Sequence, residues 1–252
     1  MCKVPIVVDF GKRTARTVPC GQCLECRLKR AREWAIRMMH EATLHEENSF
    51  ITLTYSNEYL PEFLSKRDVQ LFLKRYRKNY GEVRYYLSGE YAPDTRRPHY
   101  HSIFFGQSPD RRELEDVWQK GRCHSGNVTF RSCAYVAEYC IKSIAKDPNS
   151  PFALMSRRPG IGYGVLDKLS APRCYLNGHS HAVPRYYRTH KDLSLKNFSV
   201  IENYRQELLA KMSHSFDFGF SRGKTDRDWF DYLAQPDLDY RAKEKILKAK
   251  AR

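Results

Sequence analysis

Long hydrophobic stretches are missing from this chain of 252 residues. No apolar run approaches the roughly 20 residues that a helix needs to cross a bilayer. The first such run, Ile6-Val7-Val8, is interrupted at Asp9, so the core of a signal peptide is absent as well. Internal repeats and low-complexity tracts are also lacking, which excludes repeat architectures. We therefore expect a soluble, intracellular protein with no membrane partner.

Acidic residues are in deficit. Aspartate and glutamate total 29 against 44 lysines and arginines, which gives a formal net charge of +15. Such an excess favours a polyanionic partner such as nucleic acid, although a generally basic soluble protein would share it. Cations alternate with aromatic rings in Arg75-Tyr76-Arg77, Arg84-Tyr85-Tyr86 and Pro184-Arg185-Tyr186-Tyr187-Arg188. Because cations bind phosphates and rings stack on unpaired bases, this interleaving indicates a single-strand binder.

Hydrophobic residues make up 41% of the chain, enough for a real core. Periodicity predicts strand, helix, strand, strand, helix, strand in the order βαββαβ, preceded and followed by a helix. This order is typical of an α+β, ferredoxin-like fold, in which an antiparallel sheet carries helices on one face. Ser65 and Asp68 resemble a capping box at the start of the second helix. The expected helices are 28–45, 65–80, 111–120 and 132–146, and the expected strands are 50–55, 83–90, 99–105 and 127–131.

Three regions follow from the changes in composition. Residues 1–27 form a cysteine-rich lead-in, residues 28–147 the βαββαβ core, and residues 148–252 a basic C-terminal extension rich in proline, glycine and arginine at its start. Within the extension, residues 200–211 and 240–252 are expected to be helical.

Two histidines bracket Tyr100 at the start of an apolar run. On a strand, successive side chains point to opposite faces, so His99 and His101 project together. Glu90 ends the preceding strand, and a hairpin would bring its carboxylate to the same face. Two imidazoles and one carboxylate suit a catalytic divalent cation. A polar strand end facing solvent, with Glu90 paired to a neighbouring arginine, is the alternative.

The helix predicted after the last strand carries Tyr135, Tyr139, Lys142 and Lys146 at spacings of four, three and four, which place them along one stripe. A tyrosine phenolate can attack phosphorus and form a covalent link, and a nearby cation lowers the pKa of tyrosine, which is ordinarily about 10. Two such tyrosines would permit two successive transesterifications. Amphipathic tyrosines at the margin of a core are the alternative.

Four of the eight cysteines, Cys2, Cys20, Cys23 and Cys26, lie near the N-terminus. In a reducing compartment this cluster favours a structural zinc site over disulfides, the alternative being small buried cysteines near a helix start. A second pair of histidines, in His179-Ser180-His181, follows Asn177-Gly178 and is expected to lie in a loop that contacts DNA.

Taken together, Pro98-His99-Tyr100-His101 and the downstream tyrosine helix resemble HUH endonucleases of the rolling-circle replication initiator class. The resemblance is closest to initiators of small single-stranded DNA phages of the microvirus family, in the gokushovirus branch. It runs from about Cys20 to Tyr187. Further segments that look like that group are Cys20–Arg27, Arg32–Ala35, Phe50–Tyr55 and Arg157–Gly162.

The resemblance implies a nick in single-stranded DNA at a phage origin, with a tyrosine attached to the 5′ phosphate and a free 3′ hydroxyl that primes synthesis. Carried over by motif, His99 and His101 are ligands of Mg²⁺ or Mn²⁺, with Glu90 as third ligand. Tyr135 and Tyr139 are the nucleophiles, and Lys142 is the accompanying cation. The expected partners are origin DNA and the host helicase and polymerase, in the host bacterial cytoplasm.

Two other functions stay open from the sequence alone. A non-catalytic, zinc-containing single-strand binder or packaging protein would use the same basic and aromatic surface, but it leaves the tyrosine and lysine stripe unexplained. A metal-dependent hydrolase acting through water would cleave DNA without any protein–DNA link.

Overall fold

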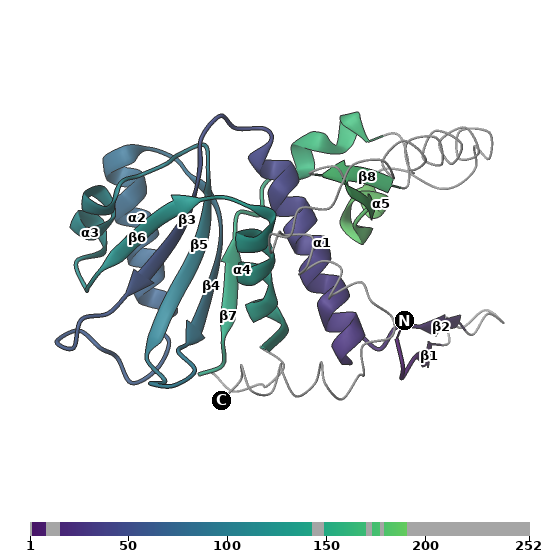
Figure 1. Ribbon diagram of the computed structural model, residues 1–252, viewed down its shortest axis with the longest axis horizontal. Coiled ribbons are helices and arrows are strands. Elements are labelled where there is room, and N and C mark those ends of the chain that lie inside the picture. Colours follow the sequence, from purple (N-terminus) through teal and green to yellow (C-terminus); the bar gives the residue numbers. More distant parts are fainter. Residues whose placement is uncertain (1, 9–15, 143–148, 170–172, 177–178, 191–252) are drawn as a thin grey trace, which may run out of the picture.

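The computed structural model describes residues 2–8, 16–142, 149–169, 173–176 and 179–190. Figure 1 shows a sheet with helices packed around it and smaller elements beside α1. In chain order the elements are β1 (Ile6–Val8), β2 (Arg16–Val18), α1 (Leu24–Ala42), β3 (Asn48–Thr54), α2 (Lys66–Tyr80), β4 (Arg84–Tyr91), β5 (Pro98–Phe105), α3 (Arg111–Trp118), β6 (Cys123–Asn127), α4 (Phe130–Lys142), β7 (Phe152–Met155), the 3₁₀ helix η1 (Tyr163–Lys168), β8 (Arg173–Leu176), β9 (His179–Ala182) and α5 (Arg185–His190).

The central sheet has five strands in the order β6-β3-β5-β4-β7. Every neighbouring pair in it is antiparallel. From β3 to β6 the elements follow one another as β-α-β-β-α-β, and β4 and β5 form the expected hairpin. The α+β class predicted from the sequence is confirmed.

Helices cover both faces of the sheet, so the expectation of helices on one face alone is wrong. Side chains of α2 and α3 pack with Leu87, Tyr100 and Phe104 on one face. On the other face, α1 and α4 pack with Tyr86 and Ile103. The central strands β4 and β5 therefore bury side chains on both faces, and the buried side chains include the polar residues Ser88, Glu90 and His101.

The start of α4 differs from the prediction. A strand was expected over 127–131, whereas β6 ends at Asn127 and the helix begins at Phe130. Thr129 and Ser132 explain this start, because each side-chain hydroxyl accepts a hydrogen bond from the other residue's backbone N–H, at 3.1 and 2.8 Å. Such reciprocal bonds satisfy the N–H groups that the first turn of a helix leaves free.

The cap predicted for α2 is present in part. The Ser65 hydroxyl accepts a hydrogen bond from the Asp68 backbone at 3.1 Å, and the helix ends at Gly81 as expected. The Asp68 carboxylate does not complete the box. It accepts a hydrogen bond from the Tyr55 hydroxyl at 2.8 Å and pairs with Lys120 at 3.4 Å. Asp68 therefore joins α2 to the end of β3.

The described residues after 148 pack on the core. β7 pairs with β4 at the edge of the sheet, and Ile161 and Tyr187 are fully buried beside α1. The predicted loop at His179-Ser180-His181 is wrong: this segment belongs to β9, which pairs with β8, and the ring of His181 stacks on Phe130. The helices predicted over 200–211 and 240–252 lie outside the described residues.

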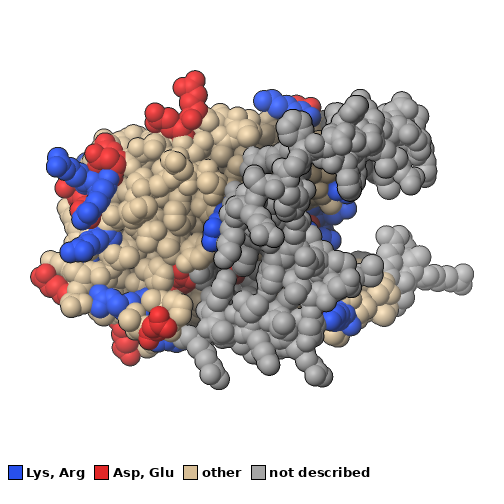
Figure 2. Space-filling model, viewed as in Figure 1, with Lys and Arg blue, Asp and Glu red and all other residues tan. Residues whose placement is uncertain are grey.

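Charged side chains are distributed unevenly over the surface. In Figure 2, lysine and arginine side chains lie mainly around the rim of the visible face, and uncharged residues cover its middle. Acidic side chains lie beside many of them, so the described part of this face shows no single basic patch. Among the described residues, no helix is long and apolar enough to cross a membrane.

Candidate metal-binding and nuclease site

The β4–β5 hairpin brings together the three metal-ligating side chains predicted from the sequence. Glu90 lies directly opposite His99 in the strand register, and His101 follows on the same face. The Glu90 Oε1 atom is 2.8 Å from His99 Nε2 and 2.9 Å from His101 Nε2. One ligand atom from each residue lies within 4.8 Å of the others. The two imidazoles and the carboxylate therefore converge on one point.

Hydrogen bonds orient both imidazoles. The Nδ1 atom of His99 is 3.2 Å from the Arg97 carbonyl oxygen, and the Nδ1 atom of His101 is 3.0 Å from the Thr52 hydroxyl. A carbonyl only accepts, so Nδ1 of His99 carries the proton, and in the neutral ring the lone pair of Nε2 faces Glu90. A lone pair that faces a carboxylate oxygen needs a cation or a proton between them. The donor set therefore fits a divalent cation.

Burial sets the charges of the cluster. Glu90 is 4% exposed and His101 7% exposed. Burial lowers the pKa of His101 and so favours its neutral form, the form that ligates a metal. Burial would raise the pKa of Glu90, but its close contacts with the imidazoles of His101 and His99 outweigh burial and leave that pKa below its usual value. Glu90 is therefore an anion at neutral pH.

Tyr135 is the predicted nucleophile that the structure places at this cluster. Its hydroxyl donates a hydrogen bond to Glu90 Oε1 at 3.0 Å, and its ring meets that of His101 edge-on at 5.0 Å. The residue is 37% exposed, so a substrate can approach it from solvent. Tyr139 and Lys142 belong to the last turns of α4, and their side chains lie outside the part of the structure that is described.

Two residues of β3 support the cluster and were not predicted. Thr52 pairs with His101 in the register and bonds its ring, and Phe50 stacks on the same ring at 5.5 Å with an interplanar angle of 8°. The alternation of Phe50, Thr52 and Thr54 places them on one face of a strand. What the sequence does not reveal is that this strand lies beside the histidines.

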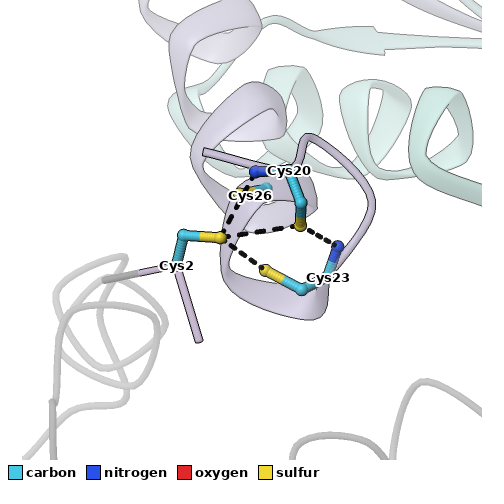
Figure 3. Close-up of side chains that lie close together, drawn as sticks. All are labelled: Cys2, Cys20, Cys23 and Cys26. Carbon is cyan, nitrogen blue, oxygen red and sulfur yellow. Dashed lines mark hydrogen bonds between the residues drawn. The ribbon is translucent and has the colours of Figure 1, made fainter. Parts of the chain in front are cut away.

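The four N-terminal cysteines form a second cluster (Figure 3). Their Sγ atoms all lie within 4.8 Å of one another. The Sγ atom of Cys2 is 3.5 Å from that of Cys20 and 3.7 Å from that of Cys23. Four thiolates around tetrahedral zinc, each about 2.3 Å from the metal, are about 3.8 Å apart. The thiols therefore have the spacing that zinc requires.

Local structure assembles these thiols from two segments. Pairing of β1 with β2 places Cys2 next to Cys20, and Cys23 and Cys26 lie at the start of α1. Backbone N–H groups of Cys23 and Gln22 lower the pKa of the Cys20 thiol to about 6, whereas burial raises that of Cys23 to about 12. The N–H groups thus stabilise a thiolate, the form that binds metal. By contrast, Cys123, Cys133 and Cys174 are separately buried in the core.

One protein family and several replication-associated proteins are similar to this chain. The family described as replication-associated protein ORF2/gene 2 protein matches residues 48–144, which include the histidine pair and the tyrosine helix. The chain is 32% identical over 207 residues to replication-associated protein VP4 of Bdellovibrio phage phiMH2K, covering 68% of this chain and 66% of that protein. It is 28% identical to replication-associated protein ORF4 of Chlamydia phage 1 over 81% of this chain and 62% of that protein.

A third relative is replication-associated protein ORF2 of Spiroplasma virus 4, with 26% identity over 87% of this chain and 72% of that protein. The chain spans just under two thirds of the length of the first two relatives. No solved structure matches it. The resemblance to phage replication initiators predicted from the histidine and tyrosine motifs is confirmed, and the chain is a relative of the replication-associated proteins of these phages.

Proposed function

We propose that this protein initiates rolling-circle replication of a small phage genome by nicking single-stranded origin DNA through a tyrosine. One observation carries the proposal: the Tyr135 hydroxyl contacts the same Glu90 oxygen that both histidines approach. A nucleophile beside a cluster of divalent-cation ligands is the arrangement that phosphoryl transfer needs. The names of the relatives, all replication-associated phage proteins, support it.

In this proposal, His99, His101 and Glu90 hold Mg²⁺ or Mn²⁺, because imidazole and carboxylate together suit such cations. When bound, the cation would polarise and orient the scissile phosphate. The core around it, with its β-α-β-β-α-β order, would be a ferredoxin-like HUH endonuclease fold.

The reaction then depends on the helix that faces the cluster. The Tyr135 hydroxyl loses its proton as its oxygen forms a bond to phosphorus, the bond from phosphorus to the 3′ oxygen breaks, and that oxygen takes up a proton. The products are a 5′-phosphotyrosyl link and a free 3′ hydroxyl. Tyr139 is the second nucleophile, which cuts the strand again in a later transesterification, and the 3′ hydroxyl released by that cut attacks the Tyr135 link, displaces the tyrosine and rejoins the strand. Lys142 favours the phenolate.

The four N-terminal thiols hold a structural zinc ion in this proposal. Four protein ligands leave no open position, so the ion would fasten the N-terminal hairpin to the start of α1 rather than take part in chemistry. The proposed partners are single-stranded origin DNA and the host replication helicase and polymerase, in the bacterial cytoplasm.

The test is formation of a covalent adduct. The purified protein is incubated with labelled single-stranded phage DNA containing the origin and Mn²⁺, and shifted protein is scored on a denaturing gel. The double variant Tyr135→Phe, Tyr139→Phe should form no adduct. Tyr175→Phe, a change to a half-exposed tyrosine on β8, is the matched control and should react normally.

Three results would contradict the proposal. Adducts that persist in the double variant would mean that the nucleophile lies elsewhere. Cleavage by the unaltered protein with no adduct would indicate a hydrolase acting through water. Binding of origin DNA without cleavage would indicate a single-strand binding or packaging protein.

A further inference from the structure

A pocket of about 540 Å³ opens at the start of β4, at the opposite end of that strand from Glu90. Arg84 and Glu90 are six residues apart and project from the same face of the sheet. At about 3.3 Å per residue, the pocket lies roughly 20 Å from the histidine cluster. The polar residues that line it include Arg77, Glu82, Arg84, Ser156, Arg157 and Arg158.

Positive charge dominates this pocket. Arg84 is paired with the buried carboxylate of Glu41, and Arg77 lies 3.2 Å from Glu82. Arg157 and Arg158 are exposed at the rim, and in the described part of the chain no carboxylate is within ion-pair distance of either guanidinium group. The pocket therefore presents two uncompensated guanidinium groups to solvent.

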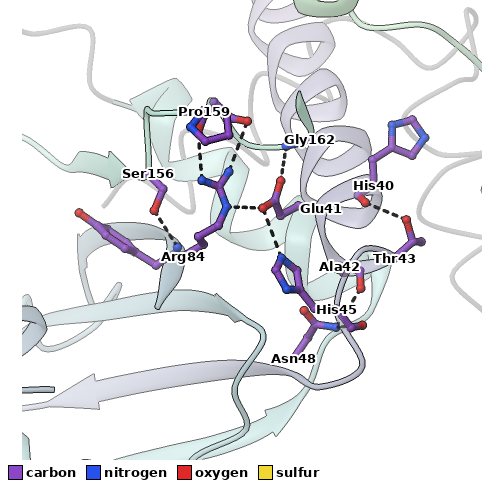
Figure 4. Close-up of polar contacts among 12 residues, drawn as sticks. His40, Glu41, Ala42, Thr43, His45, Asn48, Arg84, Ser156, Pro159 and Gly162 are labelled. Atoms are coloured by element: carbon purple, nitrogen blue, oxygen red, sulfur yellow. Dashed lines mark hydrogen bonds and ion pairs between the residues drawn. The ribbon is translucent and has the colours of Figure 1, made fainter. Parts of the chain in front are cut away.

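The segment that carries these arginines is fixed to the core (Figure 4). Arg84 donates hydrogen bonds to the carbonyl oxygens of Pro159 and Gly160 at 3.1 and 3.4 Å. The Gly162 backbone N–H donates to Glu41 Oε2 at 2.6 Å. A β-bridge between Arg157 and Gly160 closes the turn between these anchors. The rim is therefore held in place before any ligand binds, which lowers the entropic cost of binding.

Glu41 is the centre of these anchors. It is 2% exposed and accepts hydrogen bonds from both Arg84 and Gly162. Burial would raise its pKa, but the hydrogen bonds from Arg84 and Gly162 outweigh that and keep it below its usual value. The charged Glu41 carboxylate forms an ion pair with Arg84. Arg84 therefore fixes the turn, and the two rim arginines remain available for a ligand.

Ser156 adds a neutral polar group at the base of the turn. Its Oγ atom accepts a hydrogen bond from the Tyr85 backbone N–H at 3.1 Å, and its backbone N–H donates to the Tyr85 carbonyl oxygen at 2.9 Å. The hydroxyl also has a proton to donate. Guanidinium groups with a nearby hydroxyl form a set that recognises phosphate oxygens.

We propose that this pocket binds a backbone phosphate of single-stranded DNA away from the cut, with Arg157 and Arg158 as its ligands. This inference rests on the proposed function for the identity of the strand. The pocket and the histidine cluster lie at the two ends of β4, roughly 20 Å apart, so a single strand that passes outside α1 and α4 could contact both. The pocket would thus add affinity and fix the direction of the strand, while the histidine cluster acts on the phosphodiester bond.

The test measures binding of labelled oligothymidylate of about thirty nucleotides, longer than the footprint of a small single-strand-binding domain. Fluorescence anisotropy is recorded without added divalent cation over a range of salt concentrations, so that no cleavage occurs. The double variant Arg157→Ala, Arg158→Ala should bind about tenfold more weakly. Its plot of log affinity against log salt should flatten by about 0.7, because the two arginines hold one phosphate and each phosphate contact on a single strand contributes about 0.7.

Matched variants separate this site from the effect of net charge. Arg67→Ala, Arg112→Ala removes two exposed arginines from α2 and α3, on the other face of the sheet, and should change affinity and slope much less. Arg157→Lys, Arg158→Lys keeps the charge, so the slope should persist while affinity falls in part. Thermal midpoints should be unchanged in all three variants.

Equal losses in the two alanine variants would overturn the proposal, since net charge alone would explain them. An unaltered affinity in Arg157→Ala, Arg158→Ala would also overturn it and leave an acidic protein partner as the occupant to test. Because binding is measured without a divalent cation, failure of this site is distinguishable from failure to form the covalent adduct.

Discussion

The two clusters of metal-ligating side chains differ in donors and in the structure that supports them. Glu90, His99 and His101 are nitrogen and oxygen donors on two adjacent strands of the sheet. The four cysteines are sulfur donors supplied by a short hairpin and the start of α1. Both sets are compact, because in each the ligand atoms lie within 4.8 Å of one another. Tight spacing alone therefore does not reveal what a metal site does.

Donor type and number make the distinction. Three hard or intermediate donors leave positions of a divalent cation open for a substrate oxygen, whereas four thiolates complete the shell of zinc. The elements that carry the two clusters also differ. The strand pair has Tyr135, the proposed nucleophile, beside it, while the cysteines join a short N-terminal hairpin to the start of α1. We therefore expect the first cluster to govern catalysis and the second to govern stability.

The largest expected effect comes from His101→Ala. This change removes a metal ligand, which Thr52 orients. Loss of a residue that only orients a ligand slows a reaction by up to about a hundredfold, so loss of the ligand should slow adduct formation by at least that factor. The thermal midpoint should change little. His190→Ala, at an exposed histidine of α5, is the control. A full rate of adduct formation in His101→Ala would exclude this cluster as the catalytic metal site.

Replacing cysteines should lower the stability of the protein and leave adduct formation largely intact. In Cys20→Ser, Cys23→Ser, bound zinc measured by elemental analysis should fall from one ion per chain to none, and the thermal midpoint should drop by several degrees. Adduct formation at low temperature should persist. If zinc were retained, or if the variant lost adduct formation without losing stability, the division between the two clusters would be wrong.

A buried histidine outside the cluster, His40, serves as a reference for the buried His101. Burial lowers the pKa of His40 to about 4, and its Nδ1 atom is 3.0 Å from the Tyr187 hydroxyl. In the unfolded chain the pKa of this histidine is about 6.5. Below that pH, the unfolded chain therefore binds a proton at His40 that the folded chain does not bind. The free energy of unfolding therefore decreases by up to about 3 kcal/mol as the pH falls from about 6.5 toward 4.

Urea unfolding at pH 7 and at pH 5 checks this prediction. The His40→Gln variant should lose less stability over the same interval than the unaltered protein. An equal loss in both would show that other groups, and not His40, cause the acid sensitivity.

The smallest expected effect concerns the orientation of one ligand. Thr52→Val removes the hydroxyl that bonds Nδ1 of His101 and should weaken Mn²⁺ binding about tenfold, as loss of a group that orients a metal ligand typically does. Thr54→Val, two residues along the same face of β3, removes a hydroxyl that bonds the Arg122 carbonyl and should leave Mn²⁺ affinity unchanged. Isothermal titration calorimetry compares the two, and equal affinities would exclude an orienting role for Thr52.

The sequence predicts those parts of the structure that depend on local pattern. Alternation identifies β3, β4 and β5, and the turn-rich segment between Glu90 and His99 predicts the hairpin that joins them. The convergence of Glu90 with the histidines follows directly, because hairpin neighbours and strand faces are set by short-range geometry. The α4 helix and the position of Tyr135 on it are local features as well.

Features that depend on contacts between distant segments could not be predicted. One example is the packing of α1 and α4 on the face of the sheet that carries Tyr86 and Ile103. Thr52 and Phe50 join the site because β3 lies next to β5, although the two strands are far apart in the sequence. The pairing of β8 with β9 was missed because short polar strands have weak periodicity.

The most direct test of the central claim is identification of the residue joined to DNA. The adduct formed with origin DNA and Mn²⁺ is digested with nuclease and protease, and the modified peptide is sequenced by mass spectrometry. We predict a phosphotyrosyl nucleotide on Tyr135 or Tyr139, formed only when a divalent cation is present. A nucleotide on any other residue, or cleaved DNA with no modified peptide, would contradict the account.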